Sequence, residues 1–236
     1  MKLFVTGTDT NVGKTLVASA LLHQCRARGF SAIGMKPVAA GSGDVDALIA
    51  AGSVAVNGKV RTLINPYFFR EPIAPHIAAA EAGVSIDLHH IAACFGQLSK
   101  LAEAVIVEGA GGFLVPLGTK HDSADLARLL GLQLVLVVGM RLGCINHALL
   151  TQEAIKSRGL TLAGWIANRI DPDMDRFEEN LDALKTRLSA PLLGVIPFLD
   201  RPDPVVAAAC LELPATLSGD TRPGVAGENP TTLHIS

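Results

Sequence analysis

The sequence predicts a single doubly wound α/β domain, with a mostly parallel sheet and helices on both faces. Short unbroken apolar runs, such as residues 3–5 and 104–107, alternate with longer segments of helical periodicity. This alternation is typical of parallel strands that are buried on both faces. The chain has 236 residues, 49% of them hydrophobic, which is enough for the large core of one such domain.

Composition and charge exclude several classes of protein. The 20 basic and 22 acidic residues give a net charge of −2, which argues against nucleic acid as a partner. No segment approaches the roughly 18 unbroken apolar residues of a membrane span, and the start of the chain lacks the apolar stretch of a signal peptide. The four cysteines are scattered, as expected for reduced thiols. We therefore expect a cytoplasmic protein without a nucleic-acid or membrane partner.

The first candidate site is residues 3–15, LFVTGTDTNVGKT, in which a buried strand breaks at Gly7 and a helix follows the loop. A strand, a glycine-containing loop and Gly-Lys-Thr at a helix start are typical of P-loop NTPases. Backbone N–H groups there face a polyphosphate, Lys14 can reach its β and γ phosphates, and Thr15 can bind Mg²⁺. The usual spacing places the first glycine at position 8, which is Thr8 here. Because Gly7 comes one residue earlier, the front half of this loop is one residue longer than usual. The alternative is a glycine turn before an ordinary helix.

Lys36 follows the second predicted strand, residues 31–35, and so lies at the carboxyl edge of the sheet, where open α/β folds bind ligands. A lysine at a strand end is often only a solvated charge, but the phosphate-binding loop at the same edge favours a functional role. Asp46 begins a helical run over 46–49. It is either an N-cap or a carboxylate for the metal of the nucleotide, and its position leaves both interpretations open.

A strand over 104–107 delivers Glu108 to the same edge, and a glycine-rich turn follows at 109–112. An acidic residue at this point fits the Walker B role of a direct or second-sphere Mg²⁺ ligand. The alternative is a turn glutamate, which is less favourable because a charge directly after core residues is costly without a partner.

Two later segments are candidates for ligand binding. The run 142–147 leads into a helix that opens with small residues, and its N-terminus could bind a phosphate or a carboxylate. The strand 162–167 ends in Asn168-Arg169-Ile170-Asp171, one change away from the Asn-Lys-x-Asp guanine reader of GTPases. The alternative for Asn168-Arg169-Ile170-Asp171 is an asparagine that ends a strand and an aspartate before Pro172, without a role in base recognition.

The other elements complete the predicted domain, residues 1–214. Helices are predicted at 13–28, 88–101, 123–130 and 174–188, with one more ending near 158, and strands at 134–138 and 192–196. Residues 65–76 are too rich in proline for a central strand and are expected to form a loop. His76 could contact substrate, although a histidine in a loop is more often structural or solvated, and His89 and His90 receive no function. The composition of residues 215–236 predicts a flexible tail.

Several motifs in a fixed order resemble those of the dethiobiotin synthetase family, over roughly residues 3–199. They are Gly7-Thr8-Asp9-Thr10 with Val12-Gly13-Lys14-Thr15, Lys36-Pro37-Val38-Ala39, Asn65-Pro66-Tyr67, Pro75-His76, Val107-Glu108-Gly109-Ala110-Gly111-Gly112, Leu142-Gly143-Cys144-Ile145-Asn146-His147-Ala148 and Gly164-Trp165-Ile166-Ala167-Asn168. The run from Leu142 to Ala148 is the most specific, because P-loop proteins in general have no reason to carry it.

The resemblance implies an ATP- and Mg²⁺-dependent ring closure. In this reaction 7,8-diaminopelargonic acid and CO2 form a carbamate, the carbamate attacks the γ-phosphate, and the second amine closes the ureido ring. The substrate carboxylate is held by the helix start of the other subunit, so a homodimer is implied as well.

The resemblance also implies roles for individual residues. Lys36, Lys14 and Thr10 would be catalytic, and Mg²⁺ would sit on Thr15, Asp46 and Glu108. The substrate would contact Thr10, Lys36, Gly143, Cys144, Ile145 and Asn146. The nucleotide would contact Asn11, Val12, Gly13, Lys14, Thr15, Leu16, Asp46, Glu108, Gly109, Ala110, Gly111, Asn168, Arg169, Pro197, Phe198 and Leu199, with Asn168 reading the adenine.

The chain departs from the family at Asn11, where relatives often have glutamate, and at Ala40, where they can present a serine. Two other functions share the fold. A switch ATPase of the partitioning type would need an early lysine in the loop, where this chain has Thr8 and Asp9. An amide-forming synthetase would need a source of ammonia, and the chain is too short for a glutaminase domain. ATP is preferred to GTP, because arginine does not replace the lysine that packs under guanine.

Overall fold

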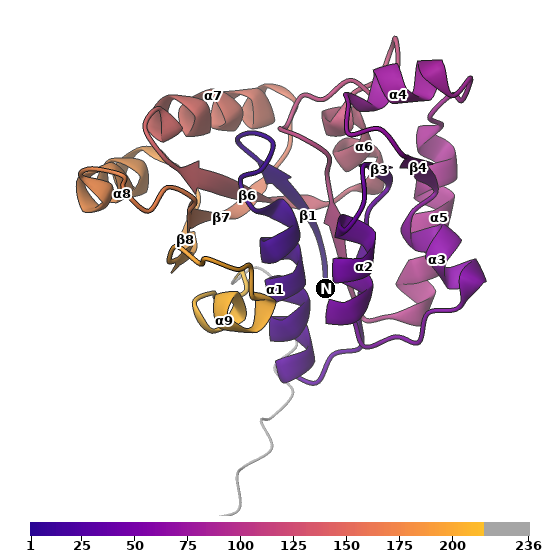
Figure 1. Ribbon diagram of the computed structural model, residues 1–236, viewed down its shortest axis with the longest axis horizontal. Helices are drawn as coiled ribbons and strands as arrows, with labels where there is room; N and C mark the ends of the chain where they lie inside the picture. The colour runs from indigo at the N-terminus through magenta and orange to yellow at the C-terminus, as the bar shows by residue number, and fades with distance from the viewer. Residues whose placement is uncertain (215–236) are drawn as a thin grey trace, which may run out of the picture.

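Six parallel strands form the central sheet in the order β2-β5-β1-β6-β7-β8, and β3 and β4 pair separately (Figure 1). The computed structural model describes residues 1–214, so the tail predicted at 215–236 lies outside the described residues. The strands are β1 Lys2–Gly7, β2 Ala32–Met35, β3 Val38–Ala40, β4 Tyr67–Phe69, β5 Ala104–Glu108, β6 Gln133–Met140, β7 Leu162–Arg169 and β8 Leu192–Ile196. The predicted doubly wound fold is confirmed.

Helices cover both faces of this sheet (Figure 1). They are α1 Lys14–Ala27, α2 Asp44–Ala51, α3 Gly58–Ile64, α4 Pro75–Glu81, α5 Leu88–Leu101, α6 Ser123–Leu130, α7 Cys144–Ser157, α8 Phe177–Arg187 and α9 Pro204–Ala209. No helix of the described residues is both long and apolar enough to cross a membrane.

The alternation of side chains along the strands explains this layering. Along β6, Val135 and Val137 pack with α1 and α9 on one face, whereas Leu134, Leu136 and Val138 pack on the other. On that second face, α5 and α6 cover the β1–β5 side and α7 and α8 cover β6 and β7. The two-sided burial keeps the strands rigid, so the residues that follow them have fixed positions.

The sequence missed elements in the proline-rich part of the chain. Residues 65–76 were expected to be a loop, but they contain β4 and the start of α4. The strand β4 is only three residues long and pairs with β3 outside the main sheet, so its prolines flank the pairing and do not interrupt it. The small sheet follows Lys36 directly and forms a wall beside the carboxyl edge.

Candidate active site

The phosphate-binding loop connects β1 to α1 and is anchored to the next strand. The N–H of Thr8 donates a hydrogen bond of 3.0 Å to the carbonyl of Val137 on β6. Two residues of the loop, Asn11 (φ 58°) and Gly13 (φ 94°), have positive φ, and Gly13 is the N-cap of α1. Glycine takes this conformation at little cost, which explains its place before the helix. The backbone thus opens the first turn of α1 toward the cleft.

A cluster of charged groups lies beside this loop, where two neighbouring strands end. Met35 is in register with Val107, so the residues that follow, Lys36 and Glu108, meet at the carboxyl edge. Lys36 Nζ lies 2.6 Å from Glu108 Oε1 and 2.7 Å from an Asp44 carboxylate oxygen. The Thr15 hydroxyl lies 2.8 Å from Glu108 Oε1 and 3.1 Å from Asp44 Oδ1. One ammonium, two carboxylates and a hydroxyl therefore converge.

Burial makes these charges depend on one another. Burial alone would lower the pKa of Lys36, but the charges of Glu108 and Asp44 outweigh it and raise that pKa, so Lys36 stays protonated. Burial alone would raise the pKa of Asp44, but the nearby ammonium of Lys36 outweighs burial, and the pKa of Asp44 is lowered. Burial raises the pKa of Glu108, and the ammonium of Lys36 limits the rise. The pKa of Glu108 therefore stays above its usual value even beside Lys36, and any further cation at this carboxylate would favour its charged form.

Lys14 is the second cation of the site, and its ammonium group is bound by its own loop. Its Nζ donates a hydrogen bond of 2.7 Å to the carbonyl of Asp9 in its own loop. Burial, helped by repulsion from Lys36, lowers the pKa of Lys14 to about 8. Two neighbouring ammonium groups that repel each other favour an anion between them. This arrangement suits a polyphosphate.

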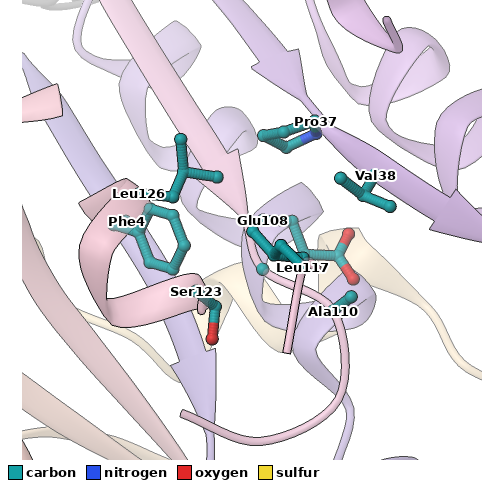
Figure 2. A pocket seen from close by; sticks show the side chains of 9 residues that line it. Phe4, Pro37, Val38, Glu108, Ala110, Leu117, Ser123 and Leu126 are labelled. Carbon is teal, nitrogen blue, oxygen red and sulfur yellow. The ribbon is translucent and has the colours of Figure 1, made fainter. Parts of the chain in front are cut away.

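The surroundings of Glu108 bear on metal binding. Glu108 lines a small pocket together with apolar residues that include Phe4, Val38 and Leu117, and Figure 2 shows its carboxylate on the side of Val38, with the ring of Phe4 on the other side. Its Oε2 is buried and has no hydrogen-bond partner in the part of the chain that the structure describes. Oxygen ligands of this kind fit Mg²⁺, which needs only a few protein ligands beside substrate phosphates. No group of three or more His, Cys, Asp or Glu side chains within residues 1–214 could hold a metal ion alone.

The structure corrects the placement expected for Asp46. This side chain is 69% exposed and pairs at 2.8 Å with Arg61 on α3, away from Thr15. Asp44 takes the expected place beside Thr15 and Lys36. The cause is helical geometry: α2 begins at Asp44, and residues two apart on a helix point in different directions. Asp44 also carries the signal that was overlooked, an acidic residue in the first turn of a helix after glycine.

A cleft of about 1380 Å³ opens at this edge. The residues predicted for the site that line it are Thr10, Asn11, Gly13, Lys14, Thr15, Leu16, Lys36, Glu108, Ala110 and Gly111. Its wall also contains residues that the sequence did not single out as site residues, including Asp44, Arg70, Pro72 and Pro202. Arg70 follows the short strand β4, which could not be recognised from the sequence, and this explains why it was missed.

Other predicted site residues lie outside the lining of this cleft. Gly143 is the N-cap of α7 with φ 91°, Cys144 is buried, and the preceding Leu142 is 94% exposed. Residues 197–199 follow β8, where Phe198 is exposed and Leu199 packs at the edge of the core. A single subunit therefore does not bring the helix start at 143–146 into the lining of the cleft.

The charged side chains at the end of β7 make contacts within their own turn. The Asp171 carboxylate accepts a hydrogen bond of 3.0 Å from the N–H of Asp173. The guanidinium of Arg169 donates to the carbonyls of Asp171 and Pro172 and lies over the ring of Phe177. Both charged groups are occupied by their own turn.

Comparison with known proteins identifies the family of this chain. A family described as an AAA domain matches residues 1–205. The chain is 58% identical over 219 residues to a protein of Aromatoleum aromaticum named ATP-dependent dethiobiotin synthetase BioD, covering 89% of this chain and 96% of that one. Proteins of the same name from Nitrosospira multiformis and a Janthinobacterium species are 56% and 50% identical, covering 83% and 89% of this chain and 87% and 93% of theirs.

Solved structures support the fold alone. The MinD cell division protein of Aquifex aeolicus has a TM-score of 0.55 at 16% identity, covering 87% of this chain and 84% of that one. A ParA family ATPase of Chlorobium tepidum has a TM-score of 0.53 at 12% identity, covering 84% and 85%. These low identities do not extend to function, whereas the identities of 50–58% over most of the chain do assign a family. The chain belongs to the dethiobiotin synthetase family.

Proposed function

We propose that this chain uses ATP to join CO2 and 7,8-diaminopelargonic acid into the ureido ring of dethiobiotin. The observation that carries the proposal is the meeting of Lys14, Lys36, Thr15, Asp44 and Glu108 in one cleft, in a member of this family. Phosphoryl transfer needs positioning and charge neutralisation more than covalent help from the protein. Two cations and a set of hard oxygen ligands provide both.

The reaction proceeds in three balanced steps. One amine of the substrate adds to CO2 and loses a proton, which gives a carbamate. A carbamate oxygen then attacks the γ-phosphorus, the bond to the bridging oxygen breaks, and ADP leaves. Finally the second amine attacks the carbonyl carbon of the carbamic–phosphoric anhydride, loses a proton and expels phosphate. Each step after the first has a leaving group that carries negative charge.

The residues of the cleft have separate parts in this reaction. Lys14 exchanges the carbonyl of Asp9 for phosphate oxygens, and Lys36 binds the carbamate and the transferred phosphoryl group. Thr10 contacts the diamine from the loop. Bound Mg²⁺ would be held by Thr15, Asp44 and Glu108 and would neutralise phosphate charge.

The nucleotide base and the substrate carboxylate lie at the two ends of the site. Asn168 and residues 197–199 form the adenine side. The substrate carboxylate binds the main-chain N–H groups at the start of α7, residues 143–146, of the other subunit of a homodimer. This explains why that helix start is absent from the cleft of one subunit.

The test is phosphate release from ATP with Mg²⁺ and bicarbonate, with and without 7,8-diaminopelargonic acid. Release that depends on the diamine, with dethiobiotin among the products, is the expected result. Hydrolysis that ignores the diamine would contradict the proposal and favour a switch ATPase.

The shared site has its own test. Lys36→Met and Asn146→Asp damage opposite halves of the composite site, so each variant alone should be inactive. A mixture that exchanges subunits should recover turnover, because one site in each mixed dimer is intact. A mixture as inactive as its components would place both halves of the site in one subunit.

A further inference from the structure

Asn168, at the end of β7, contacts the phosphate-binding loop directly. Its Nδ2 donates a hydrogen bond of 2.9 Å to the main-chain carbonyl of Val12. The side chain of Asn168 is only 5% exposed, and a hydrogen bond is stronger in such surroundings than in water. The contact therefore joins the end of one strand to the middle of a loop that lies 156 residues earlier.

The side chain of Val12 is held as firmly as its carbonyl. It is 1% exposed and fills the space above two glycines. A Cβ added at Gly7 would lie 2.6 Å from Val12 Cγ2, and one at Gly139 would lie 2.7 Å from Val12 Cγ1. Gly139 on β6 is in register with Asn168 on β7. The adjacent strands β6 and β7 thus both contact Val12: Gly139 of β6 packs against its side chain, and Asn168 of β7 donates a hydrogen bond to its carbonyl.

The loop needs such support because both neighbours of Val12 have positive φ, a conformation that is costly for Asn11 although glycine adopts it readily. Asn11 has φ 58° and Gly13 has φ 94°. Positive φ is uncommon for a residue other than glycine and persists only where the surroundings enforce it. The amide of Asn168 also packs so closely on Gly13 that a side chain there would collide with it.

We propose that Asn168 is a positioning residue that fixes the shape of the phosphate-binding loop through the Val12 carbonyl. This role is separate from the reading of adenine, and it rests on the proposed function only in taking the loop as a polyphosphate site. Loss of the Asn168 amide then weakens the binding of the phosphate chain itself, whatever base is attached.

Inorganic tripolyphosphate separates the two roles, since it carries the phosphates and no base. Asn168→Ala should weaken Mg²⁺–tripolyphosphate binding, measured by titration calorimetry, roughly threefold to tenfold, the effect of one buried hydrogen bond. The affinity for Mg²⁺–ATP should fall by at least the same factor. Asn180→Ala is the control, because Asn180 Nδ2 also donates a hydrogen bond to a main-chain carbonyl, an exposed one of 2.8 Å to Arg176 at the N-cap of α8. That variant should bind both ligands normally.

If Asn168→Ala weakens ATP but leaves tripolyphosphate unchanged, Asn168 serves the base alone and the proposal is wrong. Asn168→Thr, which keeps a residue suited to a strand but is too short to reach Val12, repeats the test if the alanine variant does not fold.

A second measurement needs no ligand. Amide hydrogen exchange over residues 8–13 should be faster in the Asn168 variants than in the unaltered chain or in Asn180→Ala, and equal rates would overturn the proposal. Dethiobiotin formation by the unaltered chain tests the proposed function separately. A chain that makes no dethiobiotin can still show the loop effect, so the two failures are distinguishable.

Discussion

Lys36 and Glu108 form an ion pair of 2.6 Å at the ends of neighbouring strands, with exposed fractions of only 4% and 1%. An ion pair this deeply buried contributes little to stability, because desolvation offsets the attraction. It holds a protonated amine and a carboxylate together at the cleft, where the proposed reaction would use both. Asp44, Thr15 and the carbonyl of Gly109 make further polar contacts with the pair.

Replacing Lys36 by methionine should reduce ring closure roughly 10²- to 10³-fold, as expected when one group that stabilises developing charge is removed. Methionine preserves much of the side-chain volume, so the cleft should keep its shape. ATP should still bind, because Lys14 and the loop are intact. The measurement is turnover beside calorimetric ATP affinity, with the exposed Lys59→Met as control. Near-normal turnover would remove Lys36 from the catalytic set.

Asp44→Asn and Asp46→Asn form a matched pair that differs by two positions. Asp44→Asn should weaken Mg²⁺-dependent ATP binding roughly 10- to 100-fold, the range for residues that support a metal. Asp46→Asn should leave it unchanged and cost less than about 1 kcal/mol of stability, since it breaks only an exposed ion pair. Magnesium titrations of ATP binding decide between them. The reverse order of effects would restore Asp46 to the site.

The pKa of Lys14, lowered to about 8 by burial and by Lys36, predicts a pH dependence of ATP binding. The phosphate chain raises the pKa of Lys14 in the complex, so binding takes up a proton once the free site has lost it. Affinity should therefore be full below pH 8 and fall about tenfold per unit above it, until the pKa of the complex is reached. Lys14→Arg should show a flat profile, because arginine stays charged. A flat profile in the unaltered chain would contradict the prediction.

Asn65 should help to position Lys36. Its Nδ2 donates hydrogen bonds of 2.7 Å to the carbonyl of Lys36 and 3.0 Å to that of Tyr67. Asn65→Ala should lower kcat several-fold, about the worth of one or two hydrogen bonds, while ATP affinity stays the same. Asn57→Ala, which removes the N-cap at the other end of α3, should cost about 1 kcal/mol of stability without changing kcat. Equal kcat values in the two variants would show that Asn65 is only structural.

The nucleotide preference follows from the turn after β7. The Asp171 carboxylate is oriented by the hydrogen bond that its Oδ1 accepts from the N–H of Asp173, so we expect it to stabilise the turn and not to read a base. Asp171→Ala should leave the ratio of ATP to GTP turnover within about twofold, since no hydrogen bond to the base is lost. Steady-state competition between the two nucleotides measures this ratio. A large shift toward ATP would mean that Asp171 does contact guanine.

Much of this protein is determined locally and could be predicted from the sequence. Short unbroken apolar runs predicted the central strands, and α5, α6 and β8 have the predicted bounds. The Gly-Lys-Thr motif located the phosphate-binding loop, and Lys36 and Glu108 were found because each follows a strand. These signals are local because periodicity and strand ends are properties of neighbouring residues.

The tertiary structure decided what depends on distant contacts. The strands β3 and β4 are three residues long and exist only because they pair with each other. Asp44 rather than Asp46 reaches Thr15, because the position at which α2 begins sets which side chain faces the cleft. The hydrogen bond from Asn168 to Val12 joins residues 156 positions apart. Such contacts carry no local sequence signal, since their free energy arises only when the sheet has brought the two segments together.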